Sequence, residues 1–169
     1  MVRSIDSDTV SFDFGTVTLH AAKKSATATA AAYGLSVWRS SVMLCRMLEH
    51  GLIPPMRTGT LVELGAGNGF PGMLVAAMRR REEVDSDGAR PPGSSPVLLT
   101  DNDPSVQKHL GKNVDLNGLR GRVEVAPLDW RKPEASPAFA AAAADSSSSS
   151  SSWIGGVPVE WVIGCDLLY

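Results

Sequence analysis

A run of closely spaced glycines between an apolar segment and a helical segment is the feature that most limits how this chain can fold. The apolar, β-branched segment 60–64 predicts a buried strand, and the sequence Gly65-Ala66-Gly67-Asn68-Gly69 follows it directly. A helix is expected to begin at Pro71 and to continue to Arg80. Glycines at alternate positions let the backbone turn tightly, and the free amides at the start of a helix favour an anionic group of a ligand. The segment therefore predicts a ligand-binding turn, although a glycine-rich turn that binds nothing would have the same pattern.

Strands and helices continue to alternate after this turn. Further strands are expected at 97–100, 122–125 and 159–163, and a second helix is expected from 104 to roughly 114. Strand–helix–strand units of this length form parallel sheets with helical crossovers. The predicted fold class is therefore α/β, with a Rossmann-like, doubly wound sheet of four central parallel strands. In such sheets ligands bind beyond the carboxyl ends of the strands.

Two segments frame this pattern. Apolar residues with helical spacing predict a helix over 36–50, before the first strand of the sheet. The polar segment 81–96 is predicted to be a loop, and it is longer than most connections in compact domains.

The remaining segments divide the chain into two parts. Apolar residues alternate within 1–20, which predicts a short β-hairpin. Segment 131–156 is a low-complexity insertion, in which an alanine run precedes a serine run. We therefore expect an N-terminal hairpin extension with its linker at 1–33, and a second unit at 34–169 that contains the insertion.

The charge balance excludes several classes of partner. The chain has 169 residues, with 16 Lys and Arg against 18 Asp and Glu and a net charge of −2. A protein that binds nucleic acid or an anionic membrane would carry a basic excess, so neither partner is expected. No segment approaches the roughly 18 consecutive apolar residues of a membrane-spanning helix, and the acidic N-terminus has no apolar signal core. These features predict a cytoplasmic protein, with the nucleus as an alternative.

Metal and disulfide sites are not expected either. Cys45 and Cys165 are far apart in the sequence and form no paired cysteine motif. His20, His50 and His109 share no ligand spacing, and each fits a surface or capping position better than a metal site. We therefore expect free thiols and no bound metal.

The glycine segment departs from two nucleotide-binding motifs and resembles a third. Phe70 stands where the dinucleotide motif G-x-G-x-x-G has its last glycine, and no phosphate-binding G-x-x-x-x-G-K-[ST] is present. Instead, Glu63 stands two residues before Gly65, and the pattern G-x-G-x-G follows. This combination resembles motif I of class I S-adenosylmethionine-dependent methyltransferases.

Polar residues at the ends of the next two strands fit a nucleoside ligand. Asp101 ends the second strand, where a carboxylate can accept both ribose hydroxyls, although a helix-capping role fits it equally. Asp103 is the better helix cap because Pro104 follows it. After the third strand, the indole of Trp130 is placed to pack on adenine and the carboxylate of Asp129 to meet the adenine amino group. A tryptophan at this position also fits a core residue.

The last strand makes the resemblance specific. It runs into Cys165-Asp166-Leu167-Leu168-Tyr169, which contains a D-x-x-Y sequence. Together with the segments 63–67, 100–101 and 128–130, this ordered set of motifs is similar to the protein-lysine methyltransferases of methyltransferase family 16. The segment Gly34-Leu35-Ser36-Val37-Trp38 resembles the helix that precedes motif I in that family, whose tryptophan lines the cofactor pocket.

This resemblance implies a function and a set of site residues. It implies S-adenosylmethionine as the cofactor and, as the partner, a protein substrate that presents a lysine ε-amine for methylation. The implied cofactor-binding residues are Trp38, Glu63, Gly65, Ala66, Gly67, Gly69, Asp101, Asp129, Trp130 and Cys165. The implied catalytic residues are Asp166, which would orient the amine, and Tyr169, whose ring would accommodate cationic methylated products. Both also fit an exposed pair at the end of a strand.

Two other functions stay open. The chain could be a non-catalytic cofactor-binding or interaction module, or a methyltransferase that acts on RNA or a small molecule. Segment 165–169 lacks the N-P-P-Y or D-P-P-Y that favours nucleobase amines, and the composition lacks a basic surface. Four predicted strands against the seven of the family also predict that the chain is a C-terminally truncated fragment, inactive or weakly active by itself.

Overall fold

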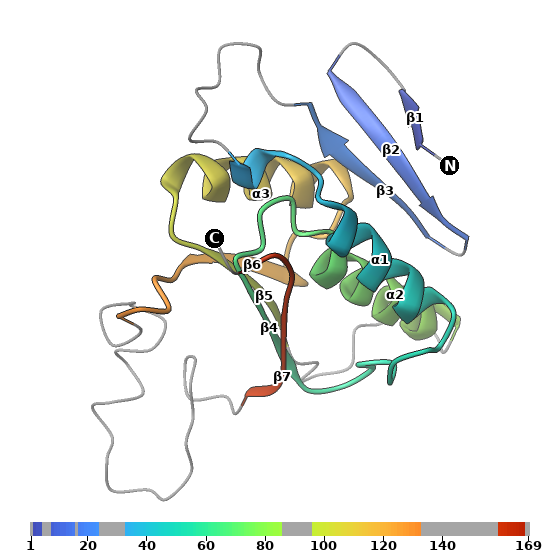
Figure 1. Ribbon diagram of the computed structural model, residues 1–169. Helices are drawn as coiled ribbons and strands as arrows, with labels where there is room; N and C mark the ends of the chain where they lie inside the picture. Colours follow the sequence, from blue (N-terminus) through green and yellow to red (C-terminus); the bar gives the residue numbers. More distant parts are fainter. Residues whose placement is uncertain are drawn as a thin grey trace, which may run out of the picture.

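The computed structural model describes residues 2–4, 8–15, 17–23, 33–85, 96–132 and 159–167, which form two sheets with helices packed against them (Figure 1). The larger sheet has four parallel strands in the order β6-β5-β4-β7. Their bounds are Thr60–Leu64 for β4, Val97–Asp101 for β5, Val123–Pro127 for β6 and Val159–Gly164 for β7. The structure therefore confirms the predicted Rossmann-like α/β class and its four parallel strands.

The two central strands, β4 and β5, are rich in apolar residues and buried on both faces, as expected for strands in the middle of a parallel sheet. In β4 and β5, only the last residue of each strand, Leu64 and Asp101, is not fully buried. The chain extends the sheet from β4 through β5 to β6, and then returns to pair β7 with the other side of β4. Ligands bind at such a switch point, beyond the carboxyl ends of the strands. The strand order therefore places the expected ligand site among the segments that follow β4, β5, β6 and β7.

Three α-helices lie within the described ranges. They are α1 (Arg39–Glu49), α2 (Phe70–Asp85) and α3 (Pro104–Leu116), and a short 3-10 helix, η1 (Tyr33–Leu35), precedes α1. α2 packs against β4 and β5, α3 packs against β5 and β6, and α1 packs against α2 (Figure 1). None of these helices is both long enough and apolar enough to cross a membrane.

The helix after the glycine turn is longer than expected. The sequence predicts its end at Arg80 and a loop over 81–96, whereas α2 continues to Asp85. Residues 81–83 have good helix propensity and include neither glycine nor proline, so nothing ends the helix at Arg80. Residues 86–95 of the expected loop and residues 133–156 of the expected insertion lie outside the described residues.

The smaller sheet forms the N-terminal part of the chain and is antiparallel, with the order β1-β2-β3. Its strands are β1 (Val2–Ser4), β2 (Thr9–Phe14) and β3 (Val17–Ala22). The predicted hairpin corresponds to β2 and β3, and the prediction missed β1, which pairs with β2. β3 packs against α2 and α3, and β2 packs against α1. The sheet therefore shares one hydrophobic core with the helices that cover the larger sheet.

Candidate functional site

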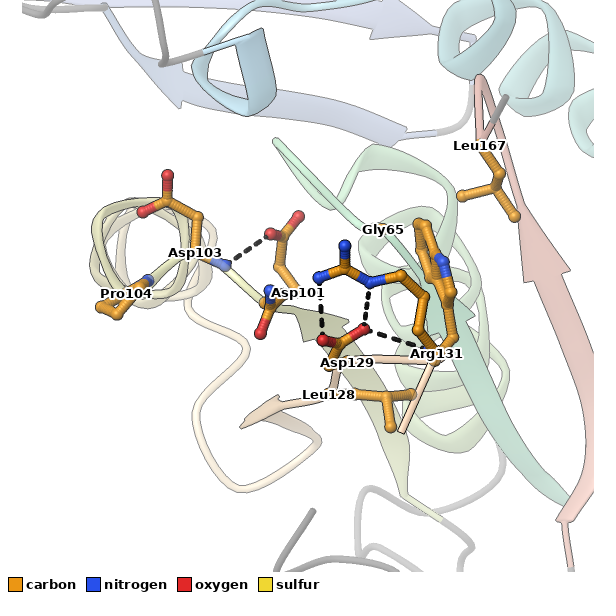
Figure 2. A pocket seen from close by; sticks show the side chains of 10 residues that line it. Gly65, Asp101, Asp103, Pro104, Leu128, Asp129, Arg131 and Leu167 are labelled. Carbon is orange, nitrogen blue, oxygen red and sulfur yellow. Dashed lines mark hydrogen bonds and ion pairs between the residues drawn. The ribbon is translucent and has the colours of Figure 1, made fainter. Parts of the chain in front are cut away.

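A cavity of about 600 Å³ lies beyond the carboxyl ends of β4, β5 and β6 (Figure 2). This volume is in the range of small-molecule sites. Its wall combines the turn after β4, the junction of β5 and α3, the segment after β6 and one residue after β7. The lining residues are Gly65, Asp101, Asn102, Asp103, Pro104, Leu128, Asp129, Trp130, Arg131 and Leu167. The strand ends that the sequence singled out therefore converge on one cavity.

Gly65 brings the backbone of the glycine turn to the wall of this cavity. Its φ of +56° lies in the left-handed region, which favours glycine. A Cβ atom at this position would lie 2.8 Å from Cδ2 of Leu167 and 3.0 Å from Cζ3 of Trp130. A side chain would therefore crowd the wall, whereas glycine leaves the backbone accessible to a ligand.

The other residues of the turn pack against the protein and do not line the cavity. Gly67 has φ +54°, and a Cβ atom there would lie 3.0 Å from the backbone oxygen of Gly34, in η1. Gly69 has φ +73°, and a Cβ atom there would lie 2.7 Å from side chains of β5 and α3. Ala66 is buried. Each glycine of the motif is therefore required for a different close contact. Gly65 is the member of the turn that lines the cavity.

Asp101 joins the glycine turn to the start of α3. Its Oδ2 accepts a hydrogen bond from the backbone N of Gly67 at 3.3 Å, and its Oδ1 accepts one from the backbone N of Asp103 at 3.0 Å (Figure 2). Asp103 caps α3, since its Oδ1 accepts a hydrogen bond from the backbone N of Ser105 at 2.7 Å. The capping role predicted for Asp103 is confirmed, while Asp101 is held in the cavity wall by two backbone amides.

Glu63 is buried against α2 and does not line the cavity. Its Oε2 accepts a hydrogen bond from the backbone N of Gly72 at 2.8 Å, and a Cβ atom at Gly72 would lie 2.7 Å from that oxygen. Burial raises the pKa of Glu63 to about 8, so its carboxyl group holds a proton at neutral pH. The sequence predicts Glu63 among the cofactor-binding residues, whereas the structure places its side chain beneath the first turn of α2.

Asp129 is paired with Arg131, a residue that the sequence analysis did not single out. The Asp129 carboxylate accepts hydrogen bonds from Nε of Arg131 at 2.8 Å and from Nη2 at 2.9 Å (Figure 2). These bonds lower the pKa of Asp129. Trp130, between them, is 42% exposed and packs beside Gly65, so it is not a core residue. An aspartate followed two residues later by an arginine forms no recognisable motif, which explains why Arg131 was missed.

Two serines at the start of α1 hold the residues that follow β7. The Ser40 hydroxyl donates a hydrogen bond to Oδ2 of Asp166. Burial raises the pKa of the Cys165 thiol to about 11, although a hydrogen bond with Ser41 acts in the opposite direction. Asp166 has φ +54° and is the only non-glycine residue in the described part of the chain with a positive φ. The next residue, Leu167, lines the cavity, whereas Asp166 is not among the lining residues.

Trp38 and Tyr169 complete the set of predicted site residues. Trp38 is the N-cap residue of α1, is 38% exposed and does not line the cavity. Tyr169 lies outside the described residues. Of the predicted catalytic pair, the structure therefore describes Asp166 alone.

Comparisons with known proteins identify the class. Residues 21–145 match the family model described as lysine methyltransferase, methyltransferase family 16. Since the match covers more than half of the chain, the protein belongs to this family. The chain is also 25% identical over 138 residues to the protein-lysine N-methyltransferase EFM3 of Chaetomium thermophilum, an alignment that covers 80% of this chain and 34% of EFM3. The chain therefore spans about a third of the length of this curated relative.

Two solved structures resemble the chain at low sequence identity. A SAM-dependent methyltransferase from Agrobacterium tumefaciens has a TM-score of 0.44 and 12% identity, over 73% of this chain and 33% of that structure. The Methanococcus jannaschii fibrillarin pre-rRNA processing protein has a TM-score of 0.39 and 16% identity, over 79% of this chain and 57% of that structure. The family assignment rests on the sequence match and not on these similarities.

Family membership implies S-adenosylmethionine as the cofactor, and the cavity fits this molecule in four respects. Its volume suits a nucleoside-sized ligand, and Gly65 leaves the wall open where a Cβ atom would stand. The carboxyl group of Asp101, which lines the cavity, is a hydrogen-bond acceptor of the kind that ligand hydroxyls require. Three aspartates and one arginine line the cavity, a balance that favours a ligand with a cationic sulfonium group.

Proposed function

We propose that this chain is part of a protein-lysine methyltransferase, which transfers a methyl group from S-adenosylmethionine to the ε-amine of a lysine side chain. The position of Asp166 carries the proposal. It follows β7, accepts a hydrogen bond from Ser40 of α1 and directly precedes Leu167, which lines the cavity. The family assignment and the similarity to EFM3 support the same activity.

Four residues are proposed to contact the cofactor directly. The Asp101 carboxylate would accept hydrogen bonds from the ribose hydroxyls, and the Trp130 indole would pack on adenine. The backbone of Gly65 would lie against the ligand. Asp129 would accept a hydrogen bond from the adenine amino group and keep its hydrogen bonds with Arg131, because a carboxylate has about four acceptor positions.

The other predicted residues are proposed to act indirectly. Ala66, Gly67 and Gly69 would shape the turn, since they do not line the cavity. Cys165 and Trp38 flank the segment that presents Asp166, one after β7 and the other before α1. Glu63 would support the turn from below through its bond to the amide of Gly72.

The chemistry needs alignment more than acid–base catalysis. S-adenosylmethionine supplies a methyl group on a sulfonium, and holding the two reactants in line removes much of the barrier to displacement. The lysine attacks as the neutral amine, so desolvation in the site helps by lowering its pKa. Ser40 occupies Oδ2 of Asp166, and among the described residues Oδ1 has no hydrogen-bond partner. Asp166 is therefore proposed to accept a hydrogen bond from the amine with Oδ1 and to direct the nitrogen lone pair at the methyl group.

The test is transfer of a labelled methyl group to a mixture of proteins by the full-length protein of which this chain is part, followed by hydrolysis and identification of the methylated amino acid. Methyl-lysine is the expected product. Asp166→Ala should lower turnover by at least about 100-fold, the low end for loss of a positioned catalytic group, and should leave cofactor affinity within a few-fold. Asp115→Ala, an exposed carboxylate on α3, is the matched control and should leave turnover unchanged. Label in RNA alone would contradict the proposal, and cofactor binding without any transfer would favour a non-catalytic module.

A further inference from the structure

The N-terminal sheet makes contacts that the proposed function does not use. The family model begins at residue 21, so β1, β2 and most of β3 precede the matched region. The sheet nevertheless reaches the glycine turn, residues 65–69, by two routes. One route is polar and passes through α3, and the other is a cluster of aromatic rings.

The polar route begins at β3, which is met by two asparagine side chains. Asn117, the C-cap residue of α3, accepts a hydrogen bond from the backbone N of His20 at 2.8 Å and donates one from Nδ2 to the backbone O of His20, also at 2.8 Å. Asn113, one turn earlier, accepts a hydrogen bond from the backbone N of Ala22 at 3.0 Å. The amides of His20 and Ala22 and the carbonyl of His20 therefore have partners on α3. At this edge of β3 the two asparagines take the place of a neighbouring strand.

Asn113 continues the route to the glycine turn. Its side chain is fully buried, and its Nδ2 donates to the backbone O of Asn68 at 3.1 Å and to Oδ1 of Asn68 at 3.3 Å. Nε2 of His109 lies 3.1 Å from the same Oδ1. Burial lowers the pKa of His109, and Oδ1 of Asn68 accepts a hydrogen bond from the ring in the tautomer that has its proton on Nε2. His109, Asn113 and Asn117, which we call the α3 polar stripe, are spaced four residues apart and so share one helix face.

The aromatic route holds the residue that follows the turn. Phe70 is the first residue of α2 and comes directly after Gly69. Its ring meets that of Phe12 edge-on, with 4.8 Å between centroids, and that of Phe14 with 6.2 Å between centroids. Phe12 and Phe14 both belong to β2. The N-terminal sheet is therefore linked to the turn at two places: at Asn68, through Asn113, and at Phe70, directly after the turn, through the rings of β2.

We propose that the N-terminal sheet belongs to the cofactor-binding machinery, and that Asn113, Asn117 and Phe12 are positioning residues that hold the glycine turn. A glycine-rich segment has a large conformational entropy when nothing restrains it, so its anchoring prepares the backbone of Gly65 for the ligand. The anchored turn also contains Gly67, whose amide bonds to Asp101 in the cavity wall. This inference rests on the proposed function, because it concerns the turn assigned to S-adenosylmethionine.

Substitutions on the two routes test the proposal by titration calorimetry with S-adenosylmethionine. Asn117→Ala removes both bonds to His20, and Phe12→Leu removes a ring contact while it keeps an apolar side chain. Each is expected to weaken binding about 10-fold, the effect of one or two net hydrogen bonds or of a comparable packing loss. Lys108→Ala, on an exposed position of α3, is the control and should bind as the unaltered chain does. Unchanged affinity in both variants would overturn the proposal, and the second variant decides it if the first does not fold.

Hydrogen exchange without any ligand separates positioning from general stability. The amides of Ala66 and Gly69 are bonded to the oxygens of Thr100 and Ala66, at 2.8 and 2.7 Å. They should exchange faster in both variants, while the amide of Val125 in β6 should exchange at its original rate. Equal acceleration at all three amides would mean that the sheet supports the whole fold and not the turn, and would overturn the proposal.

The coupling must also act in the reverse direction, because linkage between two sites is reciprocal. Bound S-adenosylmethionine should slow exchange of the amides of His20 and Ala22, which bond to the α3 polar stripe and do not line the cavity. No protection at saturating cofactor would overturn the inference. If the unaltered chain does not bind the cofactor, the proposed function fails, and the ligand-free exchange rates still decide whether the sheet holds the turn.

Discussion

The guanidinium of Arg131 forms a forked contact with the carboxylate of Asp129, with 2.8 Å between Nε and Oδ1 and 2.9 Å between Nη2 and Oδ2. Both side chains line the cavity; that of Arg131 is 72% exposed and that of Asp129 is 25% exposed. The carboxylate that the sequence predicts to meet adenine is thus already paired with a cation. Because the cofactor carries a sulfonium, Arg131 also opposes the favourable potential of the three aspartates around it.

Arg131→Ala is expected to strengthen binding of S-adenosylmethionine by about 2- to 5-fold, the scale of an exposed charge interaction. Asp129→Ala is expected to weaken binding by a similar factor. Calorimetric titration at low and at high salt checks both, since the two effects should shrink as salt screens the charges. Arg120→Ala, an exposed arginine away from the cavity, should have no effect. Weaker binding after Arg131→Ala would show that the guanidinium holds the ligand.

Two neighbouring carboxylates at the end of β5 should differ in their effects. Asp101→Ala removes the partner of two backbone amides and the proposed acceptor for the ribose hydroxyls, so S-adenosylmethionine should bind at least about 10-fold more weakly, as for lost hydrogen bonds to a charged group. Asp103→Ala removes a helix cap and should lower the free energy of unfolding by about 1 kcal/mol, with affinity changed less than 3-fold, roughly 0.7 kcal/mol. Calorimetry and urea unfolding measure the two quantities separately. Equal losses of affinity in both variants would contradict the assignment of Asp101.

Much of this site was predictable because the strands of the larger sheet are short, apolar and regularly spaced. Once they are parallel and adjacent, Asp101 and Asp129 must lie at the same rim. Asp103 was predicted as a helix cap because an aspartate directly before a proline is a local sequence signal of a helix N-terminus. The third strand of the N-terminal sheet was missed because Val2–Ser4 is too short to show alternation.

Other features depend on long-range contacts that the pattern does not reveal. Glu63 was expected at the cofactor because of its place in the motif, whereas its contact with Gly72 is set by the packing of α2 on β4. The bond between Ser40 and Asp166 joins residues 126 positions apart. The α3 polar stripe did leave a signal, since His109, Asn113 and Asn117 recur every four residues, but its partners became visible only in the folded chain.

Two glycines of the motif, Gly65 and Gly67, should differ in how strongly they affect cofactor binding and stability. At Gly65, alanine would place its Cβ atom against Leu167 and Trp130 in the cavity wall, so Gly65→Ala should weaken cofactor binding about 10-fold. Its left-handed φ also lowers the free energy of unfolding by about 1 kcal/mol, as at Gly67. At Gly67, alanine would meet the backbone oxygen of Gly34 at 3.0 Å, which cannot move without η1. Gly67→Ala should therefore lower the free energy of unfolding by about 2 kcal/mol, including the cost of a left-handed alanine.

Gly111→Ala is the control for this pair, because a Cβ atom there meets nothing within 4 Å and alanine is a better helix former. It should leave affinity unchanged and should not lower stability. Thermal unfolding and calorimetry on the three variants give the comparison. A loss of affinity at Gly67 without a loss of stability would mean that this glycine, and not Gly65, meets the ligand.

The pH dependence of stability should report on the buried carboxyl group of Glu63. Its pKa in the folded protein is about 8, above the ordinary value of 4.5, because burial disfavours the charged form. Between these two pH values the folded protein keeps a proton that the unfolded chain releases. The contribution of Glu63 to the free energy of unfolding should therefore fall as the pH rises from about 4.5 to about 8, and should be constant above that range.

Glu63→Gln removes this titration and keeps an oxygen that can accept the hydrogen bond from the amide of Gly72. The variant should gain stability relative to the unaltered chain as the pH rises from 5 to 8, by an amount that grows steadily across this range. Urea unfolding at closely spaced pH values measures the difference. Glu124→Gln, at an exposed position of β6, should show no such trend. A difference between Glu63→Gln and the unaltered chain that does not change with pH would mean that Glu63 is ionised in the folded protein, and that a cation or water reaches it behind the glycine turn.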